Sequence, residues 1–229
     1  MSDQAGRDDC CAADVDPRIA RHFDGEMAAH DEAGTLPPMK QVSQRLLTLL
    51  SDVGEARPTL LELGCGSGAL TVALLESGAV SADGVDLSPG SLSVARRRAA
   101  EAGVAERVSF QLGDASRAHV EPHDWVVLDR VICCFGEVDQ LLANSMGVAG
   151  RRYVFSVPHS RGWRGAVNHA IRAAENLTNR WRGRPCPGYT HSVPMIERRI
   201  ADAGFRRLRS TTIGLWYAAV WERAQPADG

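Results

Sequence analysis

The glycine-rich segment Thr59–Gly68 has the residue types of a ligand-binding loop. It opens with apolar residues that predict a short buried strand, interrupted by one acid, Glu62. A glycine then stands at every second position: Gly64, Gly66 and Gly68. A strand that turns through glycines into a helix exposes backbone N–H groups and lets a ligand approach the main chain closely. The spacing also fits a relaxed dinucleotide fingerprint, but the acid suits a cationic or hydroxyl-bearing ligand better than a pyrophosphate.

Three further acids stand at the ends of apolar runs. Asp86 ends Gly84–Asp86, Asp114 lies in Phe110–Ala115, and Asp129 lies in Val126–Arg130. In order and spacing, these segments and the glycine loop resemble the motifs of class I S-adenosylmethionine-dependent methyltransferases. Four matches in order are more specific than one glycine loop. The resemblance covers residues 59–223 and favours this family over the nicotinamide oxidoreductases.

The resemblance implies S-adenosylmethionine as cofactor and assigns a place to each motif residue. Asp86 would accept both ribose hydroxyls, Asp114 would contact the adenine amino group, and Glu62 would lie near the amino-acid end. The end of the fourth strand, at Asp129, would face the transferred methyl. The expected cofactor-binding residues are Glu62, Gly64, Cys65, Gly66, Gly68, Asp86, Leu87, Gly113, Asp114, Ala115 and Asp129.

Two histidines are candidates for a catalytic base. His159 follows the fifth expected strand and His191 precedes the last expected helix, so both fall on the ligand-binding edge of an open α/β sheet. Either could take a proton from a hydroxyl or amine acceptor. A carboxylate acceptor is already ionised and would need no base. The alternative is that the two histidines only brace this edge.

The adjacent cysteines Cys133 and Cys134 come just after the fourth expected strand. Buried free cysteines usually act as small hydrophobes. Alternatively, Cys134 acts chemically and Cys133 binds substrate, such as a soft metalloid, with Cys10 and Cys11 completing the site. The spacing of these pairs does not match a zinc site, so we expect no metal centre.

Residues 159–190 form an expected helical cap over the ligand edge. Apolar residues recur at helical spacing, and we expect Trp163, Val167, Ile171, Ala174 and Trp181 to face the core. The segment has one acid and six arginines. Guanidinium groups bind carboxylates and phosphates in a fixed orientation, so we expect Arg164 and Arg172 to bind an anionic substrate.

The remaining pattern alternates strands and helices and predicts a Rossmann-like α/β fold. We expect a seven-stranded, mostly parallel sheet with an antiparallel last strand and helices on both faces. Residues 1–16 are expected to be a flexible acidic tail, 17–56 an N-terminal helical lid, and 57–229 the cofactor-binding domain with its cap. The expected strands are Thr59–Leu63, Ala82–Leu87, Val108–Leu112, Trp125–Leu128, Tyr153–Val157, Arg206–Ile213 and Leu215–Glu222.

Composition narrows the class of protein. The 229 residues contain 44% hydrophobic and 24% charged residues, which is ordinary for a globular enzyme. A net charge of −2 argues against general affinity for nucleic acid. No apolar run is long enough for a membrane span, and no secretory signal is evident. The expected location is cytoplasmic, and the oligomeric state is left open.

We therefore expect methyl transfer to a small, anionic molecule, with O-methylation of a carboxylate or hydroxyl favoured. Two alternatives remain: an S- or metalloid methyltransferase that uses the cysteines, and a non-catalytic partner protein that binds S-adenosylmethionine. Gly188–Ser192 and the helix after it are also similar to the magnesium-protoporphyrin O-methyltransferases. That second resemblance covers a much shorter part of the chain.

Overall fold

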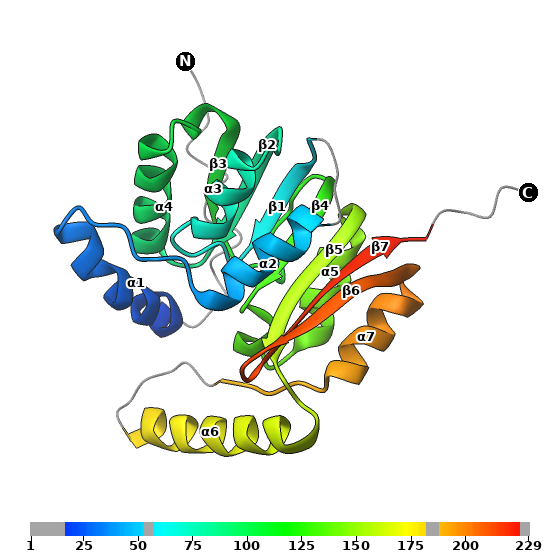
Figure 1. Ribbon diagram of the computed structural model, residues 1–229. Helices are drawn as coiled ribbons and strands as arrows, with labels where there is room; N and C mark the ends of the chain where they lie inside the picture. The colour runs from blue at the N-terminus through cyan, green and yellow to red at the C-terminus, as the bar shows by residue number, and fades with distance from the viewer. Residues whose placement is uncertain (1–16, 53–56, 182–187, 225–229) are drawn as a thin grey trace, which may run out of the picture.

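A computed structural model describes residues 17–52, 57–181 and 188–224 of the chain. Its centre is a seven-stranded sheet in the order β3-β2-β1-β4-β5-β7-β6 (Figure 1). The first five of these strands pair in parallel, and β7 runs antiparallel to both of its neighbours. The strand order reverses between β1 and β4, and open α/β sheets bind ligands beyond the strand ends at such a point. The predicted fold class is confirmed.

The strands follow the apolar runs of the sequence closely. β1 is buried from its second residue to its last, as expected for a strand covered on both faces. The β6–β7 hairpin turns at Gly214, which has a φ of 57°. The strands are β1 (Thr59–Leu63), β2 (Ser81–Asp86), β3 (Val108–Leu112), β4 (His123–Asp129), β5 (Ala149–Pro158), β6 (Phe205–Ile213) and β7 (Trp216–Arg223).

Helices pack on both faces of the sheet, and their ends follow local sequence signals. Ser88 caps α4 by accepting a hydrogen bond from the Ser91 backbone N–H, and Pro89 is the first helical residue. Ser192 caps α7 in the same way. The helices are α1 (Pro17–Glu32), α2 (Gln41–Asp52), α3 (Ala69–Glu76), α4 (Pro89–Glu101), α5 (Val138–Gly147), α6 (Gly162–Trp181) and α7 (Val193–Asp202), with short 3₁₀ turns η1 (Ala105–Arg107) and η2 (Ile132–Cys134).

The sheet separates two apolar cores. On one face, α5 and α7 pack on the strands through residues such as Leu141 and Ile196, both fully buried. On the other face, α2 and α3 do so through Leu46 and Leu75. Both cores hold the strand ends in fixed positions, so the loops that follow the strands start from a rigid base.

The cap helix α6 lies outside both cores, along one side of the molecule (Figure 1). The expectation that its apolar side chains face the core is wrong: Trp163 is 64% exposed and Trp181 86% exposed. Periodicity correctly predicted the helix, but it could not say which side of the helix meets the protein. Among the described residues, no helix is long and apolar enough to cross a membrane.

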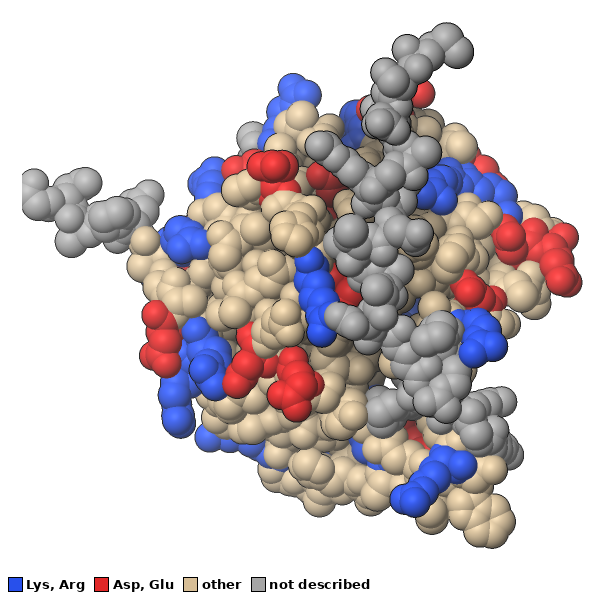
Figure 2. All heavy atoms as spheres, turned by 180° about the vertical axis from the view of Figure 1, so that it is seen from behind, with Lys and Arg blue, Asp and Glu red and all other residues tan. Residues whose placement is uncertain are grey.

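Charged side chains of both signs are interspersed over the face seen from behind (Figure 2). No broad region of one sign dominates the part of this face that the structure describes. This mixed distribution on the described part of this face agrees with the net charge of −2.

Candidate active site

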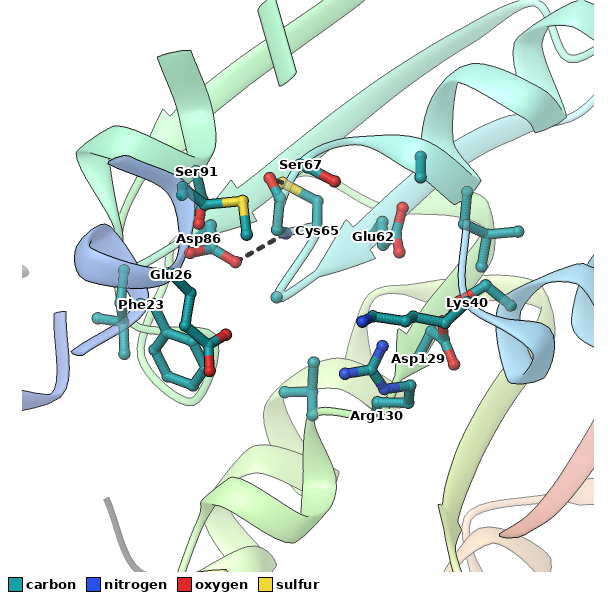
Figure 3. Close-up of a pocket in the computed structure, with 18 of the residues that line it drawn as sticks. Phe23, Glu26, Lys40, Glu62, Cys65, Ser67, Asp86, Ser91, Asp129 and Arg130 are labelled. Atoms are coloured by element: carbon teal, nitrogen blue, oxygen red, sulfur yellow. Dashed lines mark hydrogen bonds between the residues drawn. The ribbon is translucent and has the colours of Figure 1, made fainter. Parts of the chain in front are cut away.

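A cavity of about 580 Å³ lies at the carboxyl ends of β1, β2 and β4 (Figure 3). This volume is within the range of small-molecule and cofactor sites. The glycine loop and residues that follow β2, β3 and β4 form part of its wall, and α1 and the segment before α2 contribute further residues. The cavity therefore joins the N-terminal helices to the reversal point of the sheet.

Glycine is favoured at positions 64 and 66 of the loop for two different structural reasons. Gly64 has a φ of 74°, and a Cβ there would come within 2.2 Å of Cγ2 of Val131. Gly66 has a φ of 52°, but a Cβ there would meet nothing within 4 Å. Gly64 is thus required by packing against the end of β4. Gly66 borders open space in the cavity wall, where a ligand could contact the backbone.

Asp86 links the end of β2 to the glycine loop. Its Oδ2 accepts a hydrogen bond of 2.8 Å from the Gly66 N–H, and Oδ1 accepts one of 2.9 Å from the Ser88 N–H (Figure 3 draws the first). Burial raises the pKa of this carboxyl, and the two N–H donors offset part of that rise. Asp86 therefore orders the loop and also presents lone pairs to the cavity.

Glu62 is 4% exposed, at the start of the loop. Thr71 Oγ1 donates a hydrogen bond to its carboxyl group. Burial raises the pKa of Glu62 to about 8, and the neighbouring carboxylates of Asp129 and Asp86 act in the same direction. The side chain is thus mainly protonated at neutral pH, and a cation bound beside it would favour the charged form.

The end of β4 is fixed by hydroxyl groups. Asp129 accepts hydrogen bonds from Ser43 Oγ in α2 and from Ser156 Oγ in β5, the second at 2.5 Å. The next residue, Arg130, has a φ of 62°, and its backbone N–H donates to Ser156 Oγ at 2.9 Å. A left-handed conformation is unfavourable for a residue with a side chain, so the contacts around β4 hold it in place.

This turn directs the Arg130 side chain into the cavity, where Lys40 also ends (Figure 3). Lys40 is the only lysine of the chain. The two cationic side chains lie close to each other in the view, with Asp129 beside them and Glu62 above Lys40 (Figure 3). A cavity lined by carboxyl groups and by two cations can hold a ligand with both kinds of charge.

Helix α1 is fastened over the cavity by Asp24. Its Oδ1 accepts a hydrogen bond of 2.6 Å from Ser88 Oγ and one of 2.9 Å from the Gly90 N–H, at the start of α4. A carboxylate at a helix N-terminus is favoured by the unpaired N–H groups and the helix dipole. Phe23 and Glu26 of α1 consequently point into the cavity (Figure 3).

Most of the expected cofactor residues lie together in this cavity. Gly68 and Asp114 do not line it. Asp114 is 5% exposed and accepts hydrogen bonds of 2.8 Å from the Ser116 backbone N–H and hydroxyl. The expected residues that line the cavity are Glu62, Gly64, Cys65, Gly66, Asp86, Leu87, Gly113, Ala115 and Asp129.

Neither candidate base lines the cavity. His159 Nδ1 accepts a hydrogen bond of 3.1 Å from the Arg161 N–H, and its ring stands edge-on to Tyr217. His191 lies closer, because its Nε2 donates to the backbone oxygen of Phe135 at 2.8 Å, and Phe135 is part of the wall. Both histidines therefore make the contacts expected of residues that only brace this edge of the sheet.

The two adjacent cysteines have different surroundings. Cys134 lines the cavity, whereas Cys133 is 6% exposed and does not. The Cys133 thiol donates to the backbone oxygen of Arg130 at 3.4 Å, and Cys134 Sγ lies 3.8 Å from the same oxygen. A hydrogen bond from the Cys134 thiol lowers the pKa of Cys133, and the pKa of Cys134 is raised. Cys10 and Cys11 lie outside the described residues.

The two arginines expected to bind substrate do not line the cavity. Arg164 donates to the Gly214 backbone oxygen at 3.0 Å and lies over the Trp163 ring. Arg172 pairs with Glu175 at 2.6 Å. The cations of the cavity are instead Lys40 and Arg130, which were not among the residues expected from the sequence. Two sequence features could have indicated them: Lys40 is the only lysine, and Arg130 directly follows the acid of the fourth motif.

Comparisons with known proteins agree with this fold. Residues 60–148 match a family model described as a methyltransferase domain. The ribosomal protein L11 methyltransferase of Erwinia tasmaniensis is 36% identical over 86 residues, which are 38% of this chain and 27% of that protein. The chain thus spans about a quarter of the length of that relative.

Two solved structures share the fold over most of the chain. Magnesium protoporphyrin IX methyltransferase from Synechocystis, with bound S-adenosylhomocysteine, has a TM-score of 0.68 at 18% identity and covers 91% of this chain and 100% of its own. An O-methyltransferase family protein from Burkholderia thailandensis has a TM-score of 0.68 at 20% identity, over 90% of this chain and 61% of its own.

Residues 60–148 thus resemble a methyltransferase domain, and the fold around them is shared with solved methyltransferase structures. This similarity agrees with the four motifs, and S-adenosylmethionine is the cofactor that it implies. The residues present fit that cofactor: open space beside Gly66 admits a ligand to the backbone, and Asp86 and Glu62 suit its hydroxyl and cationic groups.

Glu62 leads to a prediction about pH. A cofactor that carries positive charge lowers the pKa of Glu62 on binding, so binding releases a proton below about pH 8. Affinity for S-adenosylmethionine should therefore rise as pH increases from 6 to about 8 and level off above. Calorimetry in buffers of different ionisation enthalpy measures the released protons. The Glu62→Gln protein should release fewer protons on binding, because residue 62 no longer carries a carboxyl group. An identical proton release in the wild type and in Glu62→Gln would contradict this prediction.

Proposed function

We propose that the protein transfers the methyl group of S-adenosylmethionine to a small anionic acceptor, with an oxygen of a carboxylate or hydroxyl as the favoured target. One observation carries this proposal: the cavity that holds the glycine loop and Asp86 also contains two cations, Lys40 and Arg130. These cations stand where a negatively charged acceptor would lie beside the cofactor.

In this proposal each wall of the cavity has a separate task. Asp86 accepts the ribose hydroxyls, and Leu87, Gly113 and Ala115 contact the adenine. Glu62 lies at the amino-acid end of the cofactor, at the far side of the glycine loop. The bound cofactor supplies an electrophilic methyl group on its sulfonium. Asp129 and its hydroxyl partners fix the end of β4, so that Arg130 is held in one position in the cavity wall.

The protein's own contribution is then orientation and exclusion of water. Methyl displacement needs the acceptor atom in line behind the methyl group, and two cations from different segments can orient an anion. A carboxylate acceptor needs no base, which agrees with the absence of both candidate histidines from the lining. A hydroxyl acceptor would require a base, and His191, one contact behind the wall at Phe135, is the better placed of the two.

Residues 17–56 act as a lid in this account, with the cofactor-binding domain and its cap formed by residues 57–229. Phe23 and Glu26 come from α1, and Lys40 comes from the segment before α2. Closure of this lid would cover the cofactor and bring Lys40 to the acceptor. The acidic tail expected over residues 1–16 lies outside the described residues.

A second candidate function is favoured by one observation: the Cys134 thiol is in the cavity wall. A thiol or metalloid acceptor could be recognised there, with Cys133 behind it. One experiment distinguishes the candidates. Turnover of S-adenosylmethionine is measured against carboxylates, their methyl esters, phenols, thiols and trivalent arsenite. Turnover with carboxylates or phenols supports the proposal; turnover with thiols or arsenite alone would replace it, and no turnover at all would leave a cofactor-binding partner protein.

The charge of the acceptor leads to a second prediction. Lys40→Ala and Arg130→Gly should each raise KM for the anionic acceptor by about 10-fold or more, because a hydrogen-bonded charge pair is lost. Arg130→Gly should keep the fold, since glycine readily adopts the φ of 62° found at this position. Steady-state kinetics at two salt concentrations measure the effect. Arg161→Ala, outside the lining, is the control. KM values that neither substitution changes would contradict a role for these cations.

A further inference from the structure

Helix α6 is attached to the protein by its polar side. The Asn168 side chain is 6% exposed and donates hydrogen bonds of 2.8 Å to the backbone oxygens of His159 and Leu215. Near the other end, the Asn176 side chain donates to the Gly188 oxygen at 3.0 Å and accepts from the Gly188 N–H at 2.8 Å. These contacts fix which side of the helix faces outward.

The outward side carries the large apolar residues. Five of them are at least 38% exposed, and the alanines between them are exposed as well. An amphipathic helix normally buries this side. The exposed apolar strip is defined here as Trp163, Val167, Ala170, Ala174, Leu177 and Trp181.

The strip has the spacing of a coiled-coil seam. Its members follow one another at alternating intervals of four and three residues, which is the a/d pattern of a heptad repeat. The order of sizes is also symmetric about residue 172: tryptophan at both ends, Val167 and Leu177 next, and alanines in the middle. A strip with this symmetry is complementary to itself when one of two copies is reversed.

We propose that this exposed apolar strip is the interface with a second copy of the chain, with the two α6 helices packed antiparallel about a two-fold axis. Trp163 then lies against Trp181 of the partner subunit, and Val167 against Leu177 of the partner subunit. Ala170 and Ala174 cross at the centre, where small side chains let two helices approach closely.

The residues beside the strip fit the same arrangement. In an antiparallel pair, Ile171 lies near the partner's Ile171, and Arg180 lies near the partner's Ala166. Arg164 falls beside Thr178 of the partner subunit, so no two like charges are brought together across the seam. In a parallel pair, Trp163 and Trp181 would each meet their own counterpart.

The size of the strip is sufficient for a dimer. Each tryptophan can bury about 150–250 Å², so four of them remove roughly 600 Å² or more from water. The valine and leucine of the strip, with Ile171 beside it, bring the total to about 1,000 Å², the lower limit for a specific interface. The alanines at the middle of the strip make it a weak anchor for a lipid surface, since they contribute little apolar area to insertion.

The mass in solution tests this interface directly. The chain of 24.7 kDa should sediment at twice this mass at micromolar concentration. Ala174→Glu places a carboxylate in the seam and should weaken dimerisation at least about 100-fold. Because Ala174 is exposed in one copy, the variant should keep its melting temperature at low concentration. His169→Glu adds the same charge to the same helix away from the strip and should remain a dimer.

Cross-linking tests the antiparallel direction. Equal amounts of Ala170→Cys and Ala174→Cys proteins are mixed and oxidised gently, and each protein is also oxidised alone. The proposal predicts a cross-linked dimer at residues 170 and 174 in the mixture and little at these positions in either protein alone. Cross-linking of Ala170→Cys with itself would overturn the antiparallel arrangement. A wild-type monomer, or a dimer that Ala174→Glu leaves intact, would overturn the interface, as would wild-type monomers that bind anionic vesicles through the strip.

Discussion

Asp86→Ala should weaken binding of S-adenosylmethionine by about 10-fold or more. Two ribose hydroxyls would lose a charged acceptor, a loss of about 1.5–3 kcal/mol. The Gly66 and Ser88 N–H groups would lose their acceptor as well, so the loop would also become less ordered. Isothermal titration calorimetry with S-adenosylmethionine and S-adenosylhomocysteine measures the change.

Asp83→Ala is the matched control for this prediction. Asp83 lies on the same strand, pairs with His123 at 3.0 Å and does not line the cavity. The control should therefore bind the cofactor as the wild type does. If Asp86→Ala and Asp83→Ala had equal affinities, the cofactor would not lie against the end of β2.

Gly64→Ala and Gly66→Ala should differ in how much folding stability and how much cofactor affinity each one loses. At Gly64, a Cβ would lie 2.2 Å from Val131, so the left-handed backbone and the steric overlap together should cost about 2–5 kcal/mol of folding free energy. At Gly66 the space is open, so the backbone alone should cost about 1–2 kcal/mol. The melting temperature should consequently fall roughly 5–15 °C for Gly64→Ala and less for Gly66→Ala.

Cofactor affinity should separate the two positions further. Gly66→Ala places a methyl group in the open space beside the loop and should bind S-adenosylmethionine at least about 10-fold more weakly despite its smaller loss of stability. Thermal denaturation and calorimetry on the same samples give both quantities. A stable Gly64→Ala protein, or a Gly66→Ala protein with wild-type affinity, would contradict the roles assigned to these glycines.

The sheet could be predicted from the sequence because its central strands, such as β1 and β4, are apolar runs that are followed by a glycine or end in an acid. β1 and β3 have the expected bounds, Thr59–Leu63 and Val108–Leu112, and β5 is longer at both ends than the core run Tyr153–Val157. Buried parallel strands carry this signal in their own residues. The cofactor motifs were predictable for the same reason, since each lies directly after a strand.

The position of the cations could not be predicted in the same way. Lys40 reaches the cavity from the segment between two helices, and Arg130 reaches it through a left-handed turn. Neither arrangement has a periodic pattern in the sequence. For α6, periodicity gives two opposite sides, and only the contacts of Asn168 and Asn176 decide which one faces the protein. Arg164 and Arg172 were expected to bind substrate because the apolar side of α6 was expected to face the protein, and that orientation is wrong.

We propose that this cavity binds S-adenosylmethionine beside a cationic acceptor subsite. The most direct measurement is a titration of the wild-type protein with S-adenosylmethionine, alone and with a carboxylate acceptor from the turnover screen, followed by the same titrations of Arg130→Gly. We expect both proteins to bind S-adenosylmethionine at one site per chain and S-adenosylhomocysteine to compete for that site. Arg130→Gly should weaken binding of the acceptor. Binding of a nicotinamide cofactor instead, or no cofactor binding by the wild-type protein, would contradict it.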